Sequence, residues 1–405
     1  MCTFDQALWW KALQVLRSPY SLFGPFFIKL GSFHTIMNFE SCIGYVMANT
    51  GFTELLEKIY ASNTVPHILS GKAVNRATRA HQLVSTVLSW RFIKPLLQDS
   101  DKIHIQDMLN QVLNEKLGLS AISSSQALKE LQNKITEKIS SEKADRTARL
   151  WLQYLSMVDL LRDFIRAERL GDLELHQESL RKMLPWFAAA GHFLYTKSVW
   201  IYLQQYTDLK NELPEVYRIL TGIHAVHTKQ QSIWNGQECD KAIECHLMKD
   251  VKGEGGLVSG TGFEAVQRNT FVFSRPACAE VTSAIEDIAG CTSGTSEQHM
   301  EQTQSRLKSD SHDMELLNDF FDEHDPFSGH KTLVNIVSGV EASKEVNIDT
   351  TLDSGNTILE NMHKKFVASY HFKKSSKSTN MAQKVKMKVK GKEGQHWIQP
   401  CNFND

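Results

Sequence analysis

The residues best suited to contacting nucleic acid lie near the end of the sequence. Positions 371–392 contain eight lysines and no acidic residue. In the run KVKMKVKGK, Lys384, Lys386, Lys388 and Lys390 alternate with other residues, so in an extended strand their charges would lie on one face. Such a stripe could follow a phosphate backbone by counterion release. The alternative is an edge strand whose lysines protect it from aggregation.

Two arginines on a predicted helix are further candidates for nucleic-acid contacts. Arg76 and Arg79 lie within 72–97, where apolar residues recur at helical spacing. Both guanidinium groups could contact phosphates. They could equally form the solvated face of an amphipathic helix.

Three side chains could carry acid, base or metal chemistry. Asp5 stands at a predicted helix start, where its simplest role is an N-cap. His34 follows a predicted strand and begins a helix, so it could orient a nearby acid or phosphate, or be a structural histidine. Glu244 lies on an amphipathic helix and could simply be solvated. The spacings of His192, His224 and His227 match no zinc signature.

The elements that must position these residues are mostly helical. Apolar spacing predicts a helix over 5–16, a strand over 26–30 and a second helix after Gly31, which together indicate an α/β unit. Helical spacing continues through 51–235, where the polar stretch 98–146 is predicted to be more mobile. The aromatic helix over 191–206 must be buried, because Trp200, Tyr202 and Tyr206 are too many aromatics for an exposed surface.

Composition excludes several classes of protein. The 405 residues are 41% apolar and 22% charged, as in an ordinary globular protein, with a net charge of -1. No apolar run of about 18 residues predicts a membrane span, and no secretory signal is evident, so we expect an intracellular protein. The seven scattered cysteines fit neither a disulfide framework nor a zinc site. No small-molecule substrate is indicated.

Two stretches resemble a known group of proteins. TFDQALWWKALQVL from Thr3, followed by FIKLGSFHTIM, resembles the segment around the second catalytic aspartate of Mutator-like and hAT-like transposases. It is closer still to transposon-derived, uncharacterised animal proteins that share DQxLxxKA, LGxFH and a later DxxIEQ followed by GG. The second stretch begins at Cys239 with CDKAIE, where Cys245 replaces the glutamine of that pattern.

The resemblance implies a fold and its boundaries. It implies a mostly α protein with a small α/β part, a remnant ribonuclease H-like core interrupted by a large all-helical insertion. Residues 1–50 would be a partial core segment and 51–235 the insertion. Residues 236–341 would return to the core, and 342–405 would form an α+β segment with the Lys-rich tail.

The resemblance also implies an ancestral chemistry. Asp5 and Glu244 would be carboxylate ligands of Mg²⁺ or Mn²⁺ in metal-dependent DNA cleavage and strand transfer, with His34 in support. Only four residues precede Asp5, so we expect the first catalytic carboxylate to be missing and the protein to be inactive. DNA would be the partner and the nucleus the suspected location. The alternative is a non-enzymatic helical scaffold that binds nucleic acid or protein.

Overall fold

Helices make up most of the chain in the computed structural model, which describes residues 1–18, 26–114, 125–142, 145–223, 226–227, 236–242, scattered positions from 266 to 288, 304–375, 384–389 and 392–397. The first helices are α1 (Gln6–Leu16), α2 (Ser32–Val46), α3 (Phe52–Leu56), α4 (Val65–Leu69), α5 (Val74–Ile93), η1 (Lys94–Leu96), α6 (Asp99–Leu113) and α8 (Gln126–Glu142). They are followed by α9 (Arg146–Leu170), α10 (Leu173–Ala189), α11 (Phe193–Glu212), α12 (Pro214–Ile223), α13 (Cys239–Ala242), α16 (Gln304–Glu323), η4 (Ile348–Thr350) and α17 (Thr351–Ser375). The predicted mostly helical fold is confirmed.

Three two-stranded sheets account for the described strands. β1 (Cys2–Phe4) pairs in parallel with β2 (Ile28–Leu30), β3 (Val226–His227) pairs antiparallel with β4 (Gly236–Gln237), and β5 (Lys384–Val389) pairs antiparallel with β6 (Lys392–Trp397). The predicted strand before Gly31 is therefore present as β2. The strand β1 just before Asp5 was not predicted, and it completes a parallel β1–α1–β2 unit.

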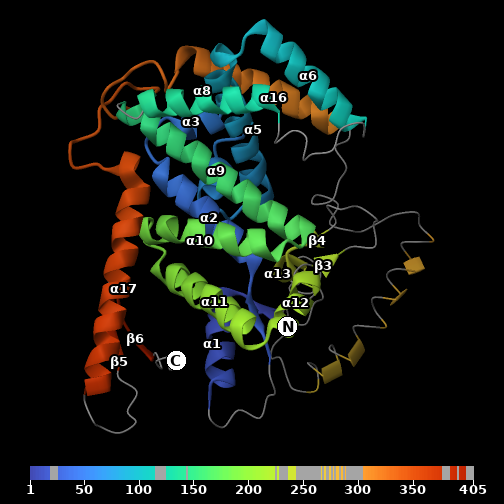
Figure 1. The fold of residues 1–405 in the computed structure, drawn as a ribbon, viewed down its shortest axis with the longest axis vertical. Coiled ribbons are helices and arrows are strands. Elements are labelled where there is room, and N and C mark those ends of the chain that lie inside the picture. The colour runs from blue at the N-terminus through green and yellow to red at the C-terminus, as the bar shows by residue number, and fades with distance from the viewer. Residues whose placement is uncertain are drawn as a thin grey trace.

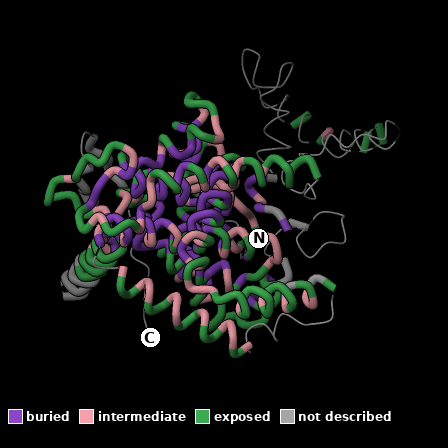
Figure 2. The backbone as a smooth tube through the Cα atoms, turned by 90° about the horizontal axis from the view of Figure 1, so that it is seen from above, coloured by how far each residue is buried: buried purple, intermediate pink, exposed green. Residues whose placement is uncertain are grey.

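Helices α2 and α9 form the centre of the molecule (Figure 1). Asp145 caps α9 by accepting the backbone N–H groups of Thr147 and Ala148 at 2.9 and 3.0 Å, and Gly171 ends the helix with a φ of 69°. Along α9, aromatic and aliphatic residues recur every three or four positions and are buried, as helical spacing predicts. Buried residues gather in the middle of the chain trace (Figure 2). Helix α9, which contributes many of them, packs against both α2 and α10.

The stretch 98–146, expected to be a more mobile helical insertion, contains α6 and α8. The described residues of this stretch are mostly helical, and its greater mobility stays a prediction. In Figure 1 these helices lie with α5 and α16 at one end of the molecule, away from the β1–β2 sheet.

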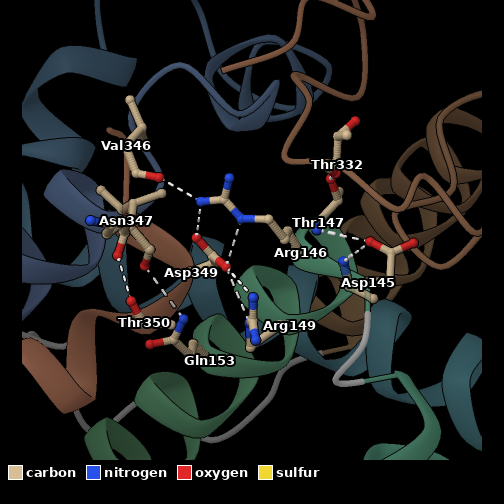
Figure 3. Close-up of polar contacts among 12 residues, drawn as sticks. Asp145, Arg146, Thr147, Arg149, Gln153, Thr332, Val346, Asn347, Asp349 and Thr350 are labelled. Carbon is tan, nitrogen blue, oxygen red and sulfur yellow. Dashed lines mark hydrogen bonds and ion pairs between the residues drawn. The ribbon is translucent and has the colours of Figure 1, made fainter. Parts of the chain in front are cut away.

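Buried charges hold segments that are far apart in the sequence. The Asp349 carboxylate of η4 is 1% exposed and accepts hydrogen bonds from the guanidinium groups of Arg146 and Arg149 at the start of α9 (Figure 3). Arg146 also donates to the Val346 carbonyl, and Thr147 donates to the Thr332 carbonyl. These contacts fasten residues 332–350 to the N-terminus of α9. Farther on, α17 runs along one side of the molecule against α10 (Figure 1).

A buried histidine makes the stability of this core depend on pH. His81 of α5 is fully buried, stacks on Phe52 with ring centroids 5.8 Å apart, and has its Nδ1 3.3 Å from the Tyr154 hydroxyl. Burial lowers the pKa of His81 from 6.5 to about 3. The unfolded chain therefore binds a proton below about pH 6.5 that the folded chain does not.

We expect His81 to cost about 2 kcal/mol of stability between pH 7 and pH 5. The stability that the protein has with a neutral, buried His81 is fully present above the unfolded pKa of the histidine. That stability is lost as the pH falls toward the lower pKa of the folded state. In urea unfolding at both pH values, His81→Leu should remove this part of the pH dependence. His67→Gln, a change at an exposed histidine, should leave the dependence unchanged. Equal pH dependence of His81→Leu and the wild type would contradict the expectation.

Candidate functional site

Asp5 lies directly after β1 and begins α1. Its backbone is extended, and its side-chain Oδ1 accepts the Leu8 N–H at 2.8 Å. The N-cap that the sequence predicts is therefore confirmed, because this bond satisfies one of the unpaired amides of the first turn. The metal-ligand role stays a prediction.

His34 lies in the first turn of α2, and its partner is an acid that the sequence reasoning missed. The His34 Nδ1 is 3.0 Å from Oδ2 of Asp240, a residue of α13. The same carboxylate accepts the backbone N–H groups of Phe33 and His34, each at 3.0 Å. Asp240 thus caps α2, whose own N-cap residue is Gly31 and offers no side chain.

Glu244 lies outside the described residues, and Asp240 stands four residues before it in the sequence CDKAIE. Residues four apart share a face of a helix, and this spacing was the signal that could have identified Asp240. Asp240 is 3% exposed. The described structure thus brings Asp5, His34 and Asp240 to the ends of β1 and β2.

The short helix α13 is held by charged groups in the interior. Glu238 and Lys241, which flank Asp240, are also buried. Lys241 donates to the Asn75 side chain at 2.9 Å, and its ammonium lies 5.3 Å from the centre of the Phe33 ring. Burial raises the pKa of Glu238, and the charge of Lys241 opposes that rise. Polar contacts of buried charged groups therefore help to hold α13 against α2.

Gly31 is required for the approach of α13 to α2. A Cβ added there would collide with Oδ2 of Asp240 and lie 3.0 Å from the Phe4 carbonyl oxygen. The carboxylate would have to withdraw from the amides of Phe33 and His34.

We expect Gly31→Ala to lower the free energy of unfolding by about 1–3 kcal/mol, through the lost cap and the forced shift. Urea unfolding measures it. In the background of Asp240→Ala the same change should cost less, because the colliding oxygen is gone. Full additivity of the two substitutions would contradict the proposed cause.

A pocket of about 500 Å³ opens beside Asp5 and His34. Asn38 of α2 and the turn between α10 and α11 complete its wall, with His192, Phe193 and Tyr195 among the lining residues. The structure therefore places two of the three predicted catalytic residues on one cavity. His192, which matched no zinc spacing, also belongs to it.

The described residues do not fit a divalent cation. No group of three or more histidine, cysteine, aspartate or glutamate side chains is placed to hold a metal among the residues that the structure describes. Both oxygens of Asp240 already accept N–H donors, and Asp5 is engaged at Oδ1. Mg²⁺ and Mn²⁺ need several oxygen ligands around one point.

Comparison with known proteins identifies a family. A family described as a domain of unknown function (DUF8702) matches residues 1–403. The chain belongs to this family. No curated protein and no solved structure matches the chain.

The predicted nucleic-acid contacts of this DUF8702 chain lie in different settings. Arg76 is exposed. Arg79 forms ion pairs with Asp310 and Asp313 of α16 and donates to the Tyr60 hydroxyl, and its side chain is 16% exposed. Its guanidinium thus fastens α16 to α5, which leaves little of it for a phosphate.

Lys384, Lys386 and Lys388 lie on β5 in the DUF8702 chain, so the predicted extended conformation is confirmed for these positions. Lys390 lies outside the described residues. Nucleic-acid binding by these lysines stays a prediction. None of the described helices is both long and apolar enough to span a membrane.

Proposed function

We propose that the chain descends from a transposase-like protein with a ribonuclease H-like core and that it no longer cleaves DNA. The observation that supports descent is the parallel β1–α1–β2 unit, with Asp5 at the end of β1 and Asp240 beside the end of β2. Acidic residues from remote parts of the sequence thus lie at the ends of the two strands of one small sheet. Such an arrangement is what metal-dependent phosphodiester chemistry requires.

Inactivity is supported by what these two carboxylates do. Each caps a helix, Asp5 on α1 and Asp240 on α2, and Asp240 also contacts the His34 ring. Asp240 accepts two backbone N–H groups and lies against the His34 ring, so few of its lone pairs are left for a cation, whereas Asp5 accepts one N–H group at Oδ1. We infer that capping has replaced metal binding at this place.

The test is incubation of the purified chain with labelled DNA and Mn²⁺. We expect no cleavage above that of a buffer control. Cleavage that disappears in Asp5→Asn, a variant that can still cap α1, would overturn the proposed inactivity. Asp172→Asn, which changes the cap of α10 instead, controls for loss of folding.

The second candidate is a non-enzymatic scaffold that binds nucleic acid, and the strand conformation of Lys384, Lys386 and Lys388 favours it. Lysines on phosphates give binding that weakens steeply with salt. We expect DNA binding at low salt that weakens when these three lysines become glutamine, with a smaller salt dependence. Binding that ignores both salt and the substitutions would exclude this candidate. A nuclear location would follow from either proposal.

A further inference from the structure

The pocket beside Asp5 contains a histidine whose proton can be placed from its neighbours. Asn38 donates its side-chain Nδ2 to the His34 carbonyl at 2.8 Å, so its Oδ1 is the acceptor oxygen. His192 Nδ1 lies 3.0 Å from that Oδ1 and must carry the hydrogen. Nε2 of a neutral His192 is then an acceptor. Burial lowers the pKa of His192, which favours the neutral ring.

Acidic side chains also give the pocket a negative electrostatic potential. Asp5 contributes a carboxylate, of which Oδ1 accepts the Leu8 N–H and Oδ2 can accept from a ligand. Burial raises the pKa of the Tyr195 phenol, and the charges of Asp240 and Asp5 raise it further. Among the described residues that line the cavity there is no lysine or arginine. A positive ligand would thus meet a favourable charge without competition from a lysine or arginine of this wall.

Three apolar side chains also line the cavity, beside the polar Gln6 and His34. Ala7 of α1 and Phe193 and Leu194 of α11 line the cavity, and Phe193 and Leu194 are 36% and 55% exposed. An aromatic face attracts cations, and the aliphatic side chains suit a short hydrocarbon. The volume of about 500 Å³ is that of a small-molecule site.

We propose that this pocket binds a primary alkylammonium group through Asp5, His192 and the apolar wall of Phe193 and Leu194. The ammonium carries three N–H donors and no acceptor, which matches a carboxylate oxygen and an imidazole acceptor. The alkyl chain lies against the apolar side. This site is independent of the proposed descent and of any DNA chemistry.

The test is a titration of the full chain with pentylamine at neutral pH, in which calorimetry or ligand-observed NMR detects binding. We expect a dissociation constant on the order of 1 mM, as suits so small a ligand. Asp5→Asn should weaken binding at least about tenfold, because a charge-assisted hydrogen bond is lost while asparagine still caps α1. Asp172→Asn, the same change at the cap of α10 and away from the pocket, should bind like the wild type.

Neutral and lysine-bearing ligands complete the experiment. Pentanol should bind much more weakly than pentylamine, and equal binding would overturn the proposal, as would Asp5→Asn binding like the wild type. If Asp5→Asn does not fold, His192→Phe, which removes the acceptor, replaces it. If pentylamine binds and Nα-acetyl-lysine methylamide does not, the natural ligand is a small alkylamine. If both bind, the site also accepts the side chain of a lysine in a peptide. Binding by neither overturns the proposal.

Discussion

Replacing Glu168 with glutamine is expected to lower the free energy of unfolding by about 3–5 kcal/mol, the largest effect we predict for a single charge. Glu168 of α9 lies 3.0 Å from Lys29 Nζ on β2 and 2.7 Å from His176 Nδ1 on α10. All three side chains are at most 1% exposed. The substitution keeps the shape but takes the counter-charge away from a buried ammonium.

The size of this effect follows from the hydration of Lys29 in the unfolded and in the folded chain. In the unfolded chain Lys29 is fully hydrated, whereas in the folded chain it has exchanged water for the Glu168 carboxylate. A glutamine amide returns only part of that interaction, so the desolvation of the ammonium is no longer offset. Typical domains are stable by about 5–15 kcal/mol, so the variant would lose a large fraction of the total.

Urea unfolding of Glu168→Gln measures the loss. Glu178→Gln is the matched control, because Glu178 pairs with Lys182 on the surface of α10, where solvent screens the ion pair and its contribution to stability is small. Replacing the pair together, as Lys29→Met with Glu168→Leu, should restore much of the stability, since no buried charge then remains from this pair. A loss from Glu168→Gln no greater than that of the control would show that the contact is not stabilising.

The fold was predictable from the sequence where apolar spacing alone decides it. The helix over 5–16 is α1, the strand before Gly31 is β2, and the helical spacing predicted through 51–235 includes α9. Each of these elements has a local sequence signal: helical spacing for α1 and α9, and an apolar run that ends at Gly31 for β2. β1 was missed because three residues paired with a distant strand leave no periodic signal.

Burial of the aromatic helix was predicted only in part. Tyr202 and Tyr206 of α11 are buried and their hydroxyls lie 2.8 Å apart, as expected for aromatics facing a core. Trp200 was predicted to be buried, which is wrong, since it is 41% exposed and stacks on His363 of α17. Whether another segment would cover one face of α11 could not be read from the helix itself.

The candidate site depends on pairs that lie far apart in the sequence. Asp5 and His34 could be singled out because each stands at an element boundary. Asp240 could have been suspected from its spacing to Glu244, but its contact with α2 could not be predicted, because it arises from the path of the chain through more than two hundred intervening residues. Arg79 was interpreted as a solvated or phosphate-binding residue, and its two acidic partners on α16 were equally invisible. Residue types suggest chemistry, whereas partners are decided by tertiary packing.

Asp349→Asn is expected to lower the free energy of unfolding by about 3 kcal/mol at pH 7, because two guanidinium groups lose their common carboxylate. This loss lies at the lower end of the range of about 3–5 kcal/mol for breaking a buried ion pair. Arg146 and Arg149 are 25% and 33% exposed and can recover part of their hydration. Asp159→Asn, at an exposed acid beside Arg162 on α9, should cost less than about 1 kcal/mol.

The pH dependence separates the charge of Asp349 from its packing. Burial alone would raise the pKa of Asp349, but the hydrogen bonds from Arg146 and Arg149 outweigh it and hold the pKa below its usual value. The contribution is therefore fully present above the unfolded pKa of about 4, and it is lost as the pH falls through the lower folded pKa. The stability difference between wild type and Asp349→Asn should stay constant from pH 7 to pH 5 and shrink below pH 4. A difference that persists unchanged to pH 2 would assign the effect to shape rather than to the ion pairs.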